Sequence, residues 1–268
     1  MIKNWLITGD IHGNLERFTT LPYDTSKRAE TAIIILGDAG FNYYGRHKSG
    51  KVYPNKKDLK MKEDAEVLGY TFYCVRGNHE FRPEHLPNII LEYDENVQGE
   101  VYYEPKYPHI KYFKNWGKYQ IGEWKTAVIS GAYSVDKFYR LGRHWQWFDD
   151  EQLSPQEQMD CKTELAYGNY DLVLTHTCPI SWQPTDLFIP TLDQSTVDNS
   201  TEEFLEDMRS YLDFNIWLFG HYHQDRYVRP GVEMLFTEIR DLNQLMQDWY
   251  NPKWEIPKGK IIDYNFHK

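Results

Sequence analysis

The sequence has few cysteines, no long apolar run and fewer basic than acidic residues. Its three cysteines, Cys74, Cys161 and Cys178, are too few and too scattered for a disulfide framework or a cysteine zinc site. The longest clean apolar run, residues 32–36, falls far short of the roughly 20 residues that a membrane helix needs. The first apolar stretch meets Asp10 too early for a signal peptide, so we expect a cytoplasmic protein without a membrane partner.

The charge balance argues against general nucleic-acid binding. The chain has 30 basic and 40 acidic residues, a net charge of −10, whereas phosphate backbones are bound through Lys and Arg. Some of the excess acidic residues could serve to bind metal cations. What the sequence does have is 41% hydrophobic residues over 268 positions, which suits one packed globular domain and excludes a disordered chain.

Short apolar runs that stop at polar clusters organise the chain. Such runs of β-branched and aromatic residues predict buried strands; they cover residues 5–8, 32–36, 70–75, 172–174 and 215–219. Helices are predicted between them, over 58–68, from the capping box at Ser154 to a stop near Gly168, and from Ser200 onward. Alternation of strands and helices predicts an α/β domain, with the polar clusters at the carboxyl ends of the strands.

Two regions break this alternation. Residues 97–131 predict antiparallel strands with turns at 115–117 and 122–123, and residues 226–239 predict a hairpin around Pro230. With no repeat or linker, we expect one domain over residues 1–240 and a tail over 241–268 packed on the same domain. The aromatic residues of the tail would cover the body; they are Trp249, Tyr250, Trp254 and Tyr264.

The polar clusters contain metal-ligating side chains. Alternate residues point the same way on an extended chain, so Asp10 with His12 and His221 with His223 each offer two donors to one place. Alone, each cluster is most simply a turn or a hydrogen-bonded core histidine. Together, carboxylate, amide and imidazole donors suit Mn, Fe or Zn ions better than Mg²⁺ or Ca²⁺. The clusters are Asp10 and His12; Asp38; Asn78 and His79; His176; and His221 and His223.

The series Gly9-Asp10-Ile11-His12-Gly13, Gly37-Asp38, Gly77-Asn78-His79-Glu80, Thr175-His176 and Gly220-His221-Tyr222-His223 resembles the calcineurin-like metallophosphoesterases. The resemblance spans residues 9–223. It implies a two-sheet β-sandwich flanked by helices, within the α/β class. It also implies a metal-dependent hydrolase of phosphoester bonds that uses two divalent transition metal ions and a bridging hydroxide, with a phosphate ester as substrate.

The resemblance also implies a role for each residue. One metal would be held by Asp10, His12 and His223, and the other by Asn78, His176 and His221, with Asp38 bridging the two. His79 would face the substrate. Its imidazole could donate a proton to the leaving oxygen.

The chain departs from the best-known branch of that family. Serine/threonine phosphatases and dinucleoside tetraphosphate hydrolases follow the bridging aspartate with Asp-Arg, whereas Asp38 here is followed by residues 39–46 without that pair. Phosphoester hydrolysis is the main hypothesis. A serine/threonine protein phosphatase, a nucleotide or dinucleoside polyphosphate hydrolase and a non-catalytic scaffold stay open as alternatives. The acidic charge disfavours a DNA-cleaving enzyme.

A loop after Ile129 carries a local cationic patch in this acidic protein. We expect its side chains to contact the substrate, because Arg forks match phosphate oxygens; they are Lys137, Arg140, Arg143 and His144. The alternative is a solvated surface loop. Arg46 and Arg76 are weaker candidates for the same role, and Glu80 could equally be a salt-bridge partner.

Overall fold

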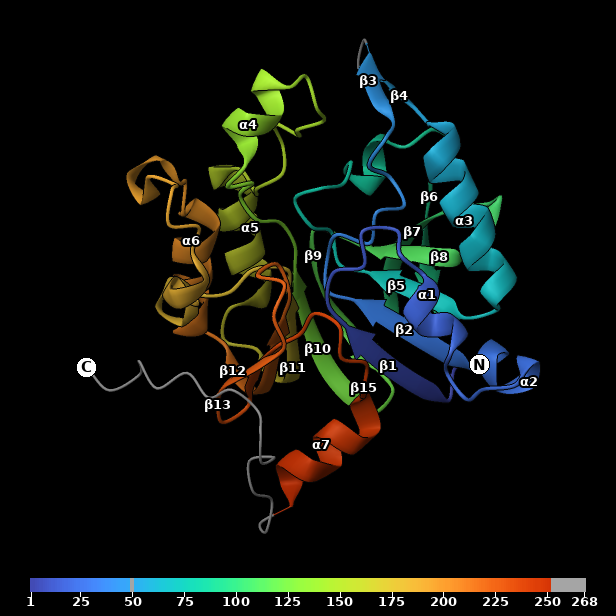
Figure 1. Ribbon diagram of the computed structural model, residues 1–268. Helices are drawn as coiled ribbons and strands as arrows, with labels where there is room; N and C mark the ends of the chain where they lie inside the picture. Colours follow the sequence, from blue (N-terminus) through green and yellow to red (C-terminus); the bar gives the residue numbers. More distant parts are fainter. Residues whose placement is uncertain (49–50, 252–268) are drawn as a thin grey trace.

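The computed structural model describes residues 1–48 and 51–251 of the chain. Figure 1 shows two sheets side by side, with helices on their outer faces. The first sheet has the strand order β15-β1-β2-β5-β8-β7-β6. Its strands are β1 (Asn4–Thr8), β2 (Thr31–Ile35), β5 (Thr71–Cys74), β6 (Ile90–Asp94), β7 (Gly99–Glu104), β8 (Tyr107–Phe113) and β15 (Arg240–Asp241). Strands β1, β2, β5 and β8 pair in parallel, so their carboxyl ends share one edge.

The second sheet has the order β13-β14-β12-β11-β10-β9. Its strands are β9 (Trp116–Ile121), β10 (Trp124–Ile129), β11 (Asn169–Thr175), β12 (Asp213–Phe219), β13 (Arg226–Arg229) and β14 (Val232–Met234). Strands β10, β11, β12 and β14 are parallel. A separate hairpin of β3 (Arg46–Lys48) and β4 (Lys51–Tyr53) projects at the top of Figure 1.

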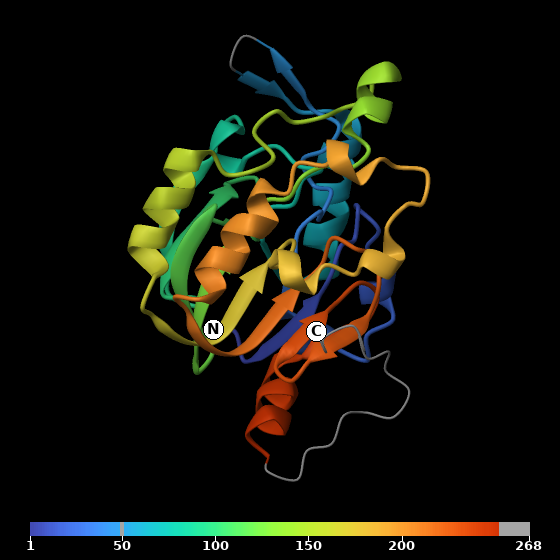
Figure 2. The same ribbon diagram turned by 90° about the vertical axis from the view of Figure 1, so that its left-hand side faces the viewer.

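Helices cover both outer faces, as Figures 1 and 2 show. The helices are α1 (Glu16–Thr19), α2 (Thr25–Ala29), α3 (Lys56–Leu68), α4 (Lys137–Gly142), α5 (Pro155–Leu165), α6 (Ser200–Arg209) and α7 (Leu242–Tyr250). Short 3₁₀ turns are η1 (Pro83–His85), η2 (Ile180–Trp182), η3 (Thr185–Leu187) and η4 (Gln194–Thr196). No helix in the described ranges is long and apolar enough to cross a membrane.

Alternate residues of each central strand enter different cores. Ile34 of β2 and Leu174 of β11 meet in the core between the sheets. Ile33 packs outward with residues of α3, and Val173 packs outward with residues of α5 and α6. Both faces of these strands are therefore buried, which is why their sequences are continuous apolar runs. The predicted two-sheet β-sandwich flanked by helices is confirmed.

The predicted helices are confirmed with small changes at their ends. Helix α3 begins two residues earlier than predicted, because Asn55 provides a capping box. Helix α5 has the predicted cap at Ser154 with Pro155 in its first turn, but it ends at Leu165, before Gly168. Helix α6 begins at Ser200 as predicted. The hairpin of β13 and β14 is confirmed as well. Cys74, Cys161 and Cys178 are free and buried.

The prediction for residues 97–131 was wrong in one respect. The two hairpins β7–β8 and β9–β10 exist, but they belong to different sheets. Trp116 and Gly117, predicted as part of a turn, lie in β9, and the chain crosses between the sheets just before them. Strand β8 pairs in parallel with β5, and β10 pairs in parallel with β11. Local turn signals are the same whichever sheet a hairpin joins.

The segment after Ile129 is not wholly a loop, because Lys137–Gly142 forms the short helix α4. At the other end of the chain, Leu242, Leu245 and Met246 of α7 are buried in the core between the sheets. Trp249 packs partly against that core, and Tyr250 is more than half exposed. Trp254 and Tyr264 lie outside the described residues, so the packing of the whole tail stays a prediction.

Candidate metal centre

The candidate ligands all follow strand ends at one edge of the sandwich. Asp10 and His12 follow β1, and Asp38 follows β2. Asn78 follows β5, His176 follows β11, and His221 and His223 follow β12. Four of these residues have a positive φ: His12 (46°), Asp38 (49°), His221 (71°) and His223 (53°). Non-glycine residues avoid this region, and such strain collects at functional sites.

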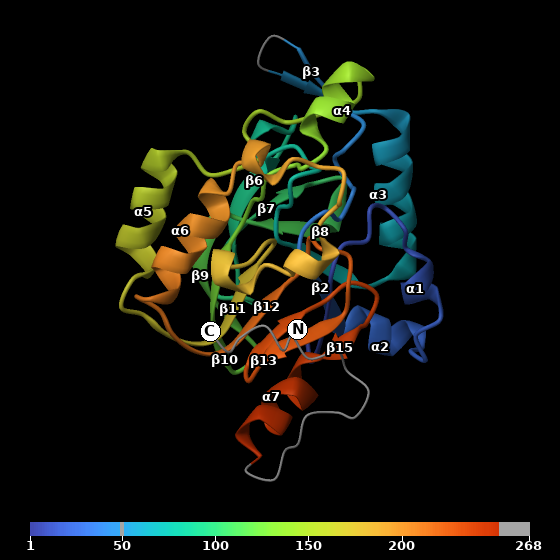
Figure 3. The same cartoon turned by 60° about the vertical axis from the view of Figure 1, so that its left-hand side comes forward.

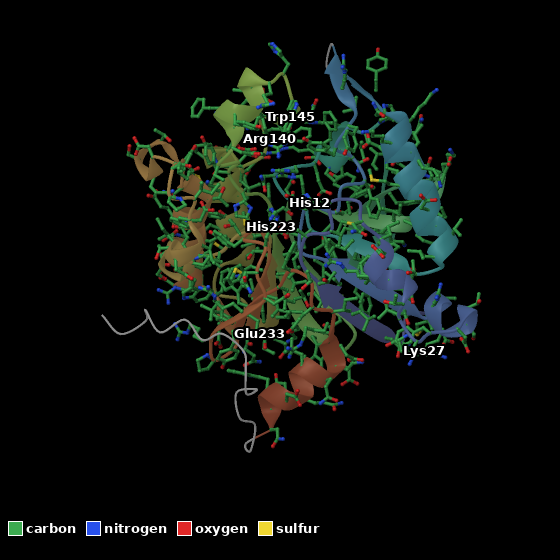
Figure 4. The ribbon with its side chains drawn as sticks, viewed as in Figure 1. His12, Lys27, Arg140, Trp145, His223 and Glu233 are labelled. Carbon is green, nitrogen blue, oxygen red and sulfur yellow. The ribbon has the colours of Figure 1, made fainter. Side chains whose placement is uncertain are left out.

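One group of donors surrounds the buried carboxylate of Asp10. His12 Nε2 and His223 Nε2 lie 3.0 Å apart, and His223 Nε2 lies 3.2 Å from Asp10 Oδ2. Figure 4 shows His12 and His223 close together in the middle of the molecule. Asp10 Oδ2 is buried and accepts no well-formed hydrogen bond from the described residues. A buried carboxylate oxygen facing two imidazoles in this way suits a cation.

A second group joins His176 and Asn78. His176 Nδ1 lies 2.7 Å from the Leu36 carbonyl oxygen, which only accepts, so the ring proton belongs on Nδ1 and Nε2 keeps a lone pair. Asn78 donates from Nδ2 to Ser134 Oγ at 2.8 Å, which turns its Oδ1 toward His176 Nε2 at 2.9 Å. In the neutral ring, two acceptor atoms therefore face each other.

Asp38 lies between these two groups. Its Oδ1 is 3.7 Å from His176 Nε2, and it also accepts a hydrogen bond of 2.8 Å from the His79 backbone N–H. Donor atoms of Asp10, Asp38 and His176 all lie within 4.8 Å of one another. His221 completes the set, because its ring packs edge-on against that of His176 with centroids 4.9 Å apart.

The electrostatics keep Asp10 and His221 in the protonation states that bind metal. Burial alone would raise the pKa of Asp10, but His176 and His223 hold it below its ordinary value. Burial together with the neighbouring His176 lowers the pKa of His221 to about 3, so its imidazole is neutral. His223 is the exception, because its close contact with Asp10 raises its pKa, so a metal ion would displace a proton from this ring. Ionised carboxylates and neutral imidazoles are the forms that coordinate metal.

His79 lies at the rim of the donor set. Its Nδ1 is 4.0 Å from Asp38 Oδ2, and its ring stacks on Tyr43 with centroids 6.0 Å apart. Arg140 Nη2 lies 3.0 Å from Nδ1 and 3.1 Å from Nε2 of His79. Burial and this guanidinium lower the pKa of His79, although Asp38 opposes the shift. Since Arg only donates, the contact favours a neutral His79 ring.

The structure separates the predicted cationic patch. Arg140 is buried and reaches His79, held by Asp136 Oδ1 at 2.7 Å and by the Tyr43 hydroxyl at 2.6 Å. Lys137 Nζ instead lies over the Trp147 ring, at 4.1 Å from its centroid. The Arg143 guanidinium lies over Tyr139 at 4.8 Å. Figure 4 places Arg140 and Trp145 by α4, above His12.

The remaining candidates lie apart from the donors. His144 has a positive φ of 54° and is exposed at the end of α4, and Arg46 is exposed in β3. Arg76 is buried and donates from Nε to Asn115 Oδ1 at 2.8 Å, which ties the loop after β5 to the second sheet. Glu80 accepts backbone hydrogen bonds from Gly40 and Gly77. Arg76 and Glu80 thus support the loops that carry the ligands.

Sequence reasoning missed the residues that orient Asn78. The backbone N–H and the hydroxyl of Ser134 both donate to Glu151, at 2.9 and 2.6 Å, and Ser134 in turn accepts from Asn78. Glu151 is buried. Such partners of ligand residues tune metal sites. Their signal in the sequence is weak, because they are single polar residues 56 and 73 positions after Asn78, outside any strand-end cluster.

Glycine is required where the backbone passes close to a ligand. A Cβ on Gly220 would lie 2.4 Å from Asp10 Oδ1 and 2.9 Å from the Leu36 carbonyl oxygen. We therefore expect Gly220→Ala to displace Asp10 and weaken metal binding by about 10- to 100-fold. Metal titration checks this. The matched control is Gly142→Ala, where a Cβ meets nothing within 4 Å; equal metal affinity in both variants would contradict the prediction.

The sandwich fold gathers carboxylates and imidazoles at its strand ends, an arrangement that could hold metal ions in an α/β protein. The sequence model described as calcineurin-like phosphoesterase matches residues 4–225. The chain therefore belongs to the calcineurin-like phosphoesterase family, whose members are hydrolases of phosphoester bonds that use divalent metal ions.

Other comparisons add little. No curated protein matches the chain. Among solved structures, the chain is similar to TT1561 of Thermus thermophilus, with 11% sequence identity, a TM-score of 0.42, and coverage of 90% of this chain and 98% of that one. A second solved structure also has 11% identity and a TM-score of 0.42, with coverage of 91% and 96%.

Proposed function

We propose that this enzyme hydrolyses phosphoester bonds with a dinuclear centre. Asp10, His12 and His223 would hold one divalent transition metal ion. Asn78, His176 and His221 would hold the other, with Asp38 between the two. The observation that carries the proposal is the 2.9 Å approach of two lone-pair atoms, His176 Nε2 and Asn78 Oδ1. A cation between them turns this unfavourable contact into shared coordination.

The donor set favours Mn, Fe or Zn ions. Imidazole nitrogens suit these metals, whereas Mg²⁺ and Ca²⁺ prefer shells of oxygen. When bound, such a pair of ions would neutralise phosphoryl oxygens and acidify a water molecule, which would supply the nucleophile. The two aspartates would balance the charge of the ions. The network from Glu151 through Ser134 fixes the amide of Asn78, so this ligand is oriented before metal arrives.

His79 would act on the leaving group. Its ring is held between Tyr43 and Arg140 at the rim of the donors, where a phosphoryl group bound by the metals would be in reach. Its neutral ring would donate a hydrogen bond to the departing oxygen, and it would donate a proton once a bound, anionic phosphoryl group raises its pKa. Arg140 would position this ring; its donors are shared among Asp136, Tyr43 and His79. Lys137, Arg143 and His144 stay proposed as more distant substrate contacts.

Metal content tests the dinuclear centre. We expect two ions per chain in protein supplied with Mn²⁺ or Zn²⁺, and hydrolysis of 4-nitrophenyl phosphate that a chelator abolishes and added metal restores. Elemental analysis and a steady-state assay measure both. No more than trace metal in the supplied protein would overturn the proposal. Phosphopeptides and nucleotides assayed beside the aryl ester decide between the main hypothesis and the protein phosphatase or nucleotide hydrolase alternatives.

A further inference from the structure

Two cavities open beside His79 and share it as a lining residue. The larger has a volume of about 350 Å³ and reaches from Asp38, Asn78 and His221 toward the segment between η2 and α6. The smaller has a volume of about 220 Å³ and is lined by His12, Tyr43 and Tyr44 among others. The larger cavity therefore begins at the candidate metal centre and continues away from it.

The far wall of the larger cavity is mainly apolar, and its polar side chains are uncharged amides. It is built by the segment 183–199, which Figures 2 and 3 show in gold between β11 and α6. Its apolar residues are Leu187, Phe188, Ile189, Leu192 and Val197, and Gln183, Gln194 and Asn199 of the same segment add uncharged polar groups. Leu187 is 37% and Ile189 51% exposed. Large apolar side chains gathered at the mouth of a site mark a surface that a ligand covers.

Neither cavity, as far as the described residues form it, has a Lys or Arg side chain that could bind a second phosphate group of a substrate. Among the described residues that line them, none is Lys or Arg, whereas Asp136 and Glu202 line the larger one. Glu202 is buried; its Oε1 accepts from Thr177, and its Oε2 has no hydrogen-bond partner among the described residues. The guanidinium of Arg140, which reaches His79, is already paired with Asp136. A further phosphate in this cavity would therefore find no free Lys or Arg among the described lining residues to neutralise it.

We propose that the substrate of this enzyme is a phosphoester whose substituent is uncharged and mainly apolar, and that this substituent binds in the larger cavity against the 183–199 wall. The proposal rests on the proposed function, since the phosphoryl group is taken to bind at the metal centre. Specificity then follows from two physical terms. Burial of the substituent supplies affinity, and the absence of Lys and Arg among the described lining residues disfavours polyphosphates.

Binding of alkylphosphonates to the metal-loaded protein tests this, with Kd measured by titration calorimetry. Each fully buried methylene strengthens binding about fourfold. We therefore expect butylphosphonate to bind roughly 10- to 60-fold more tightly than methylphosphonate, with phenylphosphonate close to butylphosphonate. A negative heat-capacity change should accompany the gain. Whether the cavity prefers an aliphatic or an aromatic substituent is shown by which of butylphosphonate and phenylphosphonate has the lower Kd.

Two variants test whether the preference for the butyl group depends on the 183–199 wall. Leu192→Ser should reduce the butyl-over-methyl preference at least threefold while leaving Kd for methylphosphonate unchanged. The control, Met159→Ser, alters an exposed apolar residue (63% exposed) on α5, outside the cavity lining, and should leave the preference intact. Equal losses in both variants would contradict the assignment of the wall.

Phosphonates with a charged substituent about as long as butyl test the proposal from the other side, because tight binding of either would overturn it. Propane-1,3-bisphosphonate binding more tightly than butylphosphonate would indicate a polyphosphate substrate. A 3-(trimethylammonio)propylphosphonate that matches or exceeds butylphosphonate would show that Glu202 and Asp136 select a cation. A Kd independent of the substituent would also refute the proposal. Failure of the metal-loaded protein to hydrolyse any aryl phosphate is a separate result, and it would refute the proposed function instead.

Discussion

Asp38→Ala should lower kcat/KM for 4-nitrophenyl phosphate by about 10³-fold or more, the largest loss of any ligand substitution. Asp38 is buried between the two donor groups. Burial alone would raise its pKa, but His79, His176 and His12 hold that pKa well below the ordinary value. Asp38 is therefore an anion at neutral pH. Its removal would leave two cations facing each other without shared negative charge.

Metal analysis distinguishes a lost bridge from a lost fold. We expect Asp38→Ala to bind fewer than two ions per chain while its thermal unfolding, measured without metal, stays cooperative. Asp94→Asn is the matched control, since Asp94 is a buried carboxylate that pairs with Lys111 and Tyr73 away from the site. Its folded fraction should keep normal metal content and activity. An Asp38→Ala variant with two ions and near-normal rate would refute the bridging role.

His79→Asn should have an effect that depends on the leaving group. If His79 donates a proton, hydrolysis of phenyl phosphate should fall by about 10²–10⁴-fold. 4-Nitrophenyl phosphate, whose phenolate leaves without help, should lose much less. Two metal ions should remain in the variant, because Asn78 and not His79 is the proposed ligand. Steady-state rates on both esters, together with elemental analysis, give the answer.

The contacts of His79 make the other outcomes informative. Its ring lies with His12 and Asp38 in a group whose donor atoms are all within 4.8 Å, so loss of metal in His79→Asn would mean that His79 is a ligand. An equal loss on both esters, with metal retained, would mean that it stabilises transition-state charge through its N–H. His109→Asn is the control, because His109 is exposed and pairs with Glu66 away from the site.

Several features of this fold could be predicted from the sequence because their signals are local. The strands around Ile34, Leu174 and Leu218 are buried on both faces, which forces continuous apolar runs. The start of helix α5 could also be predicted, because both hydrogen bonds of the capping box at Ser154 lie within four consecutive residues. Because the polar clusters follow parallel strands, the sequence also predicted that they meet at one edge, where Asp10, Asp38 and His176 indeed lie close together.

Other features could not be predicted, because they depend on partners distant in the chain. The orientation of the Asn78 amide comes from Ser134 and Glu151, on a loop of the second sheet. The sequence predicts Arg140 as a substrate contact on a loop, and nothing in that local pattern indicates its burial against His79, 61 positions away. The apolar wall around Leu192 has no regular periodicity, so no pattern distinguished it from an ordinary surface loop.

The sequence by itself determined which residues are candidate metal ligands and that each follows a strand, because strand ends and turn glycines are set by neighbours in the chain. Only the tertiary structure decided that β8 and β9 belong to different sheets, which brings the His176 and His221 loops of one sheet against Asp10 and Asp38 of the other. Hairpin signals act over a few residues, whereas the choice of sheet depends on which apolar faces bury each other across the whole domain.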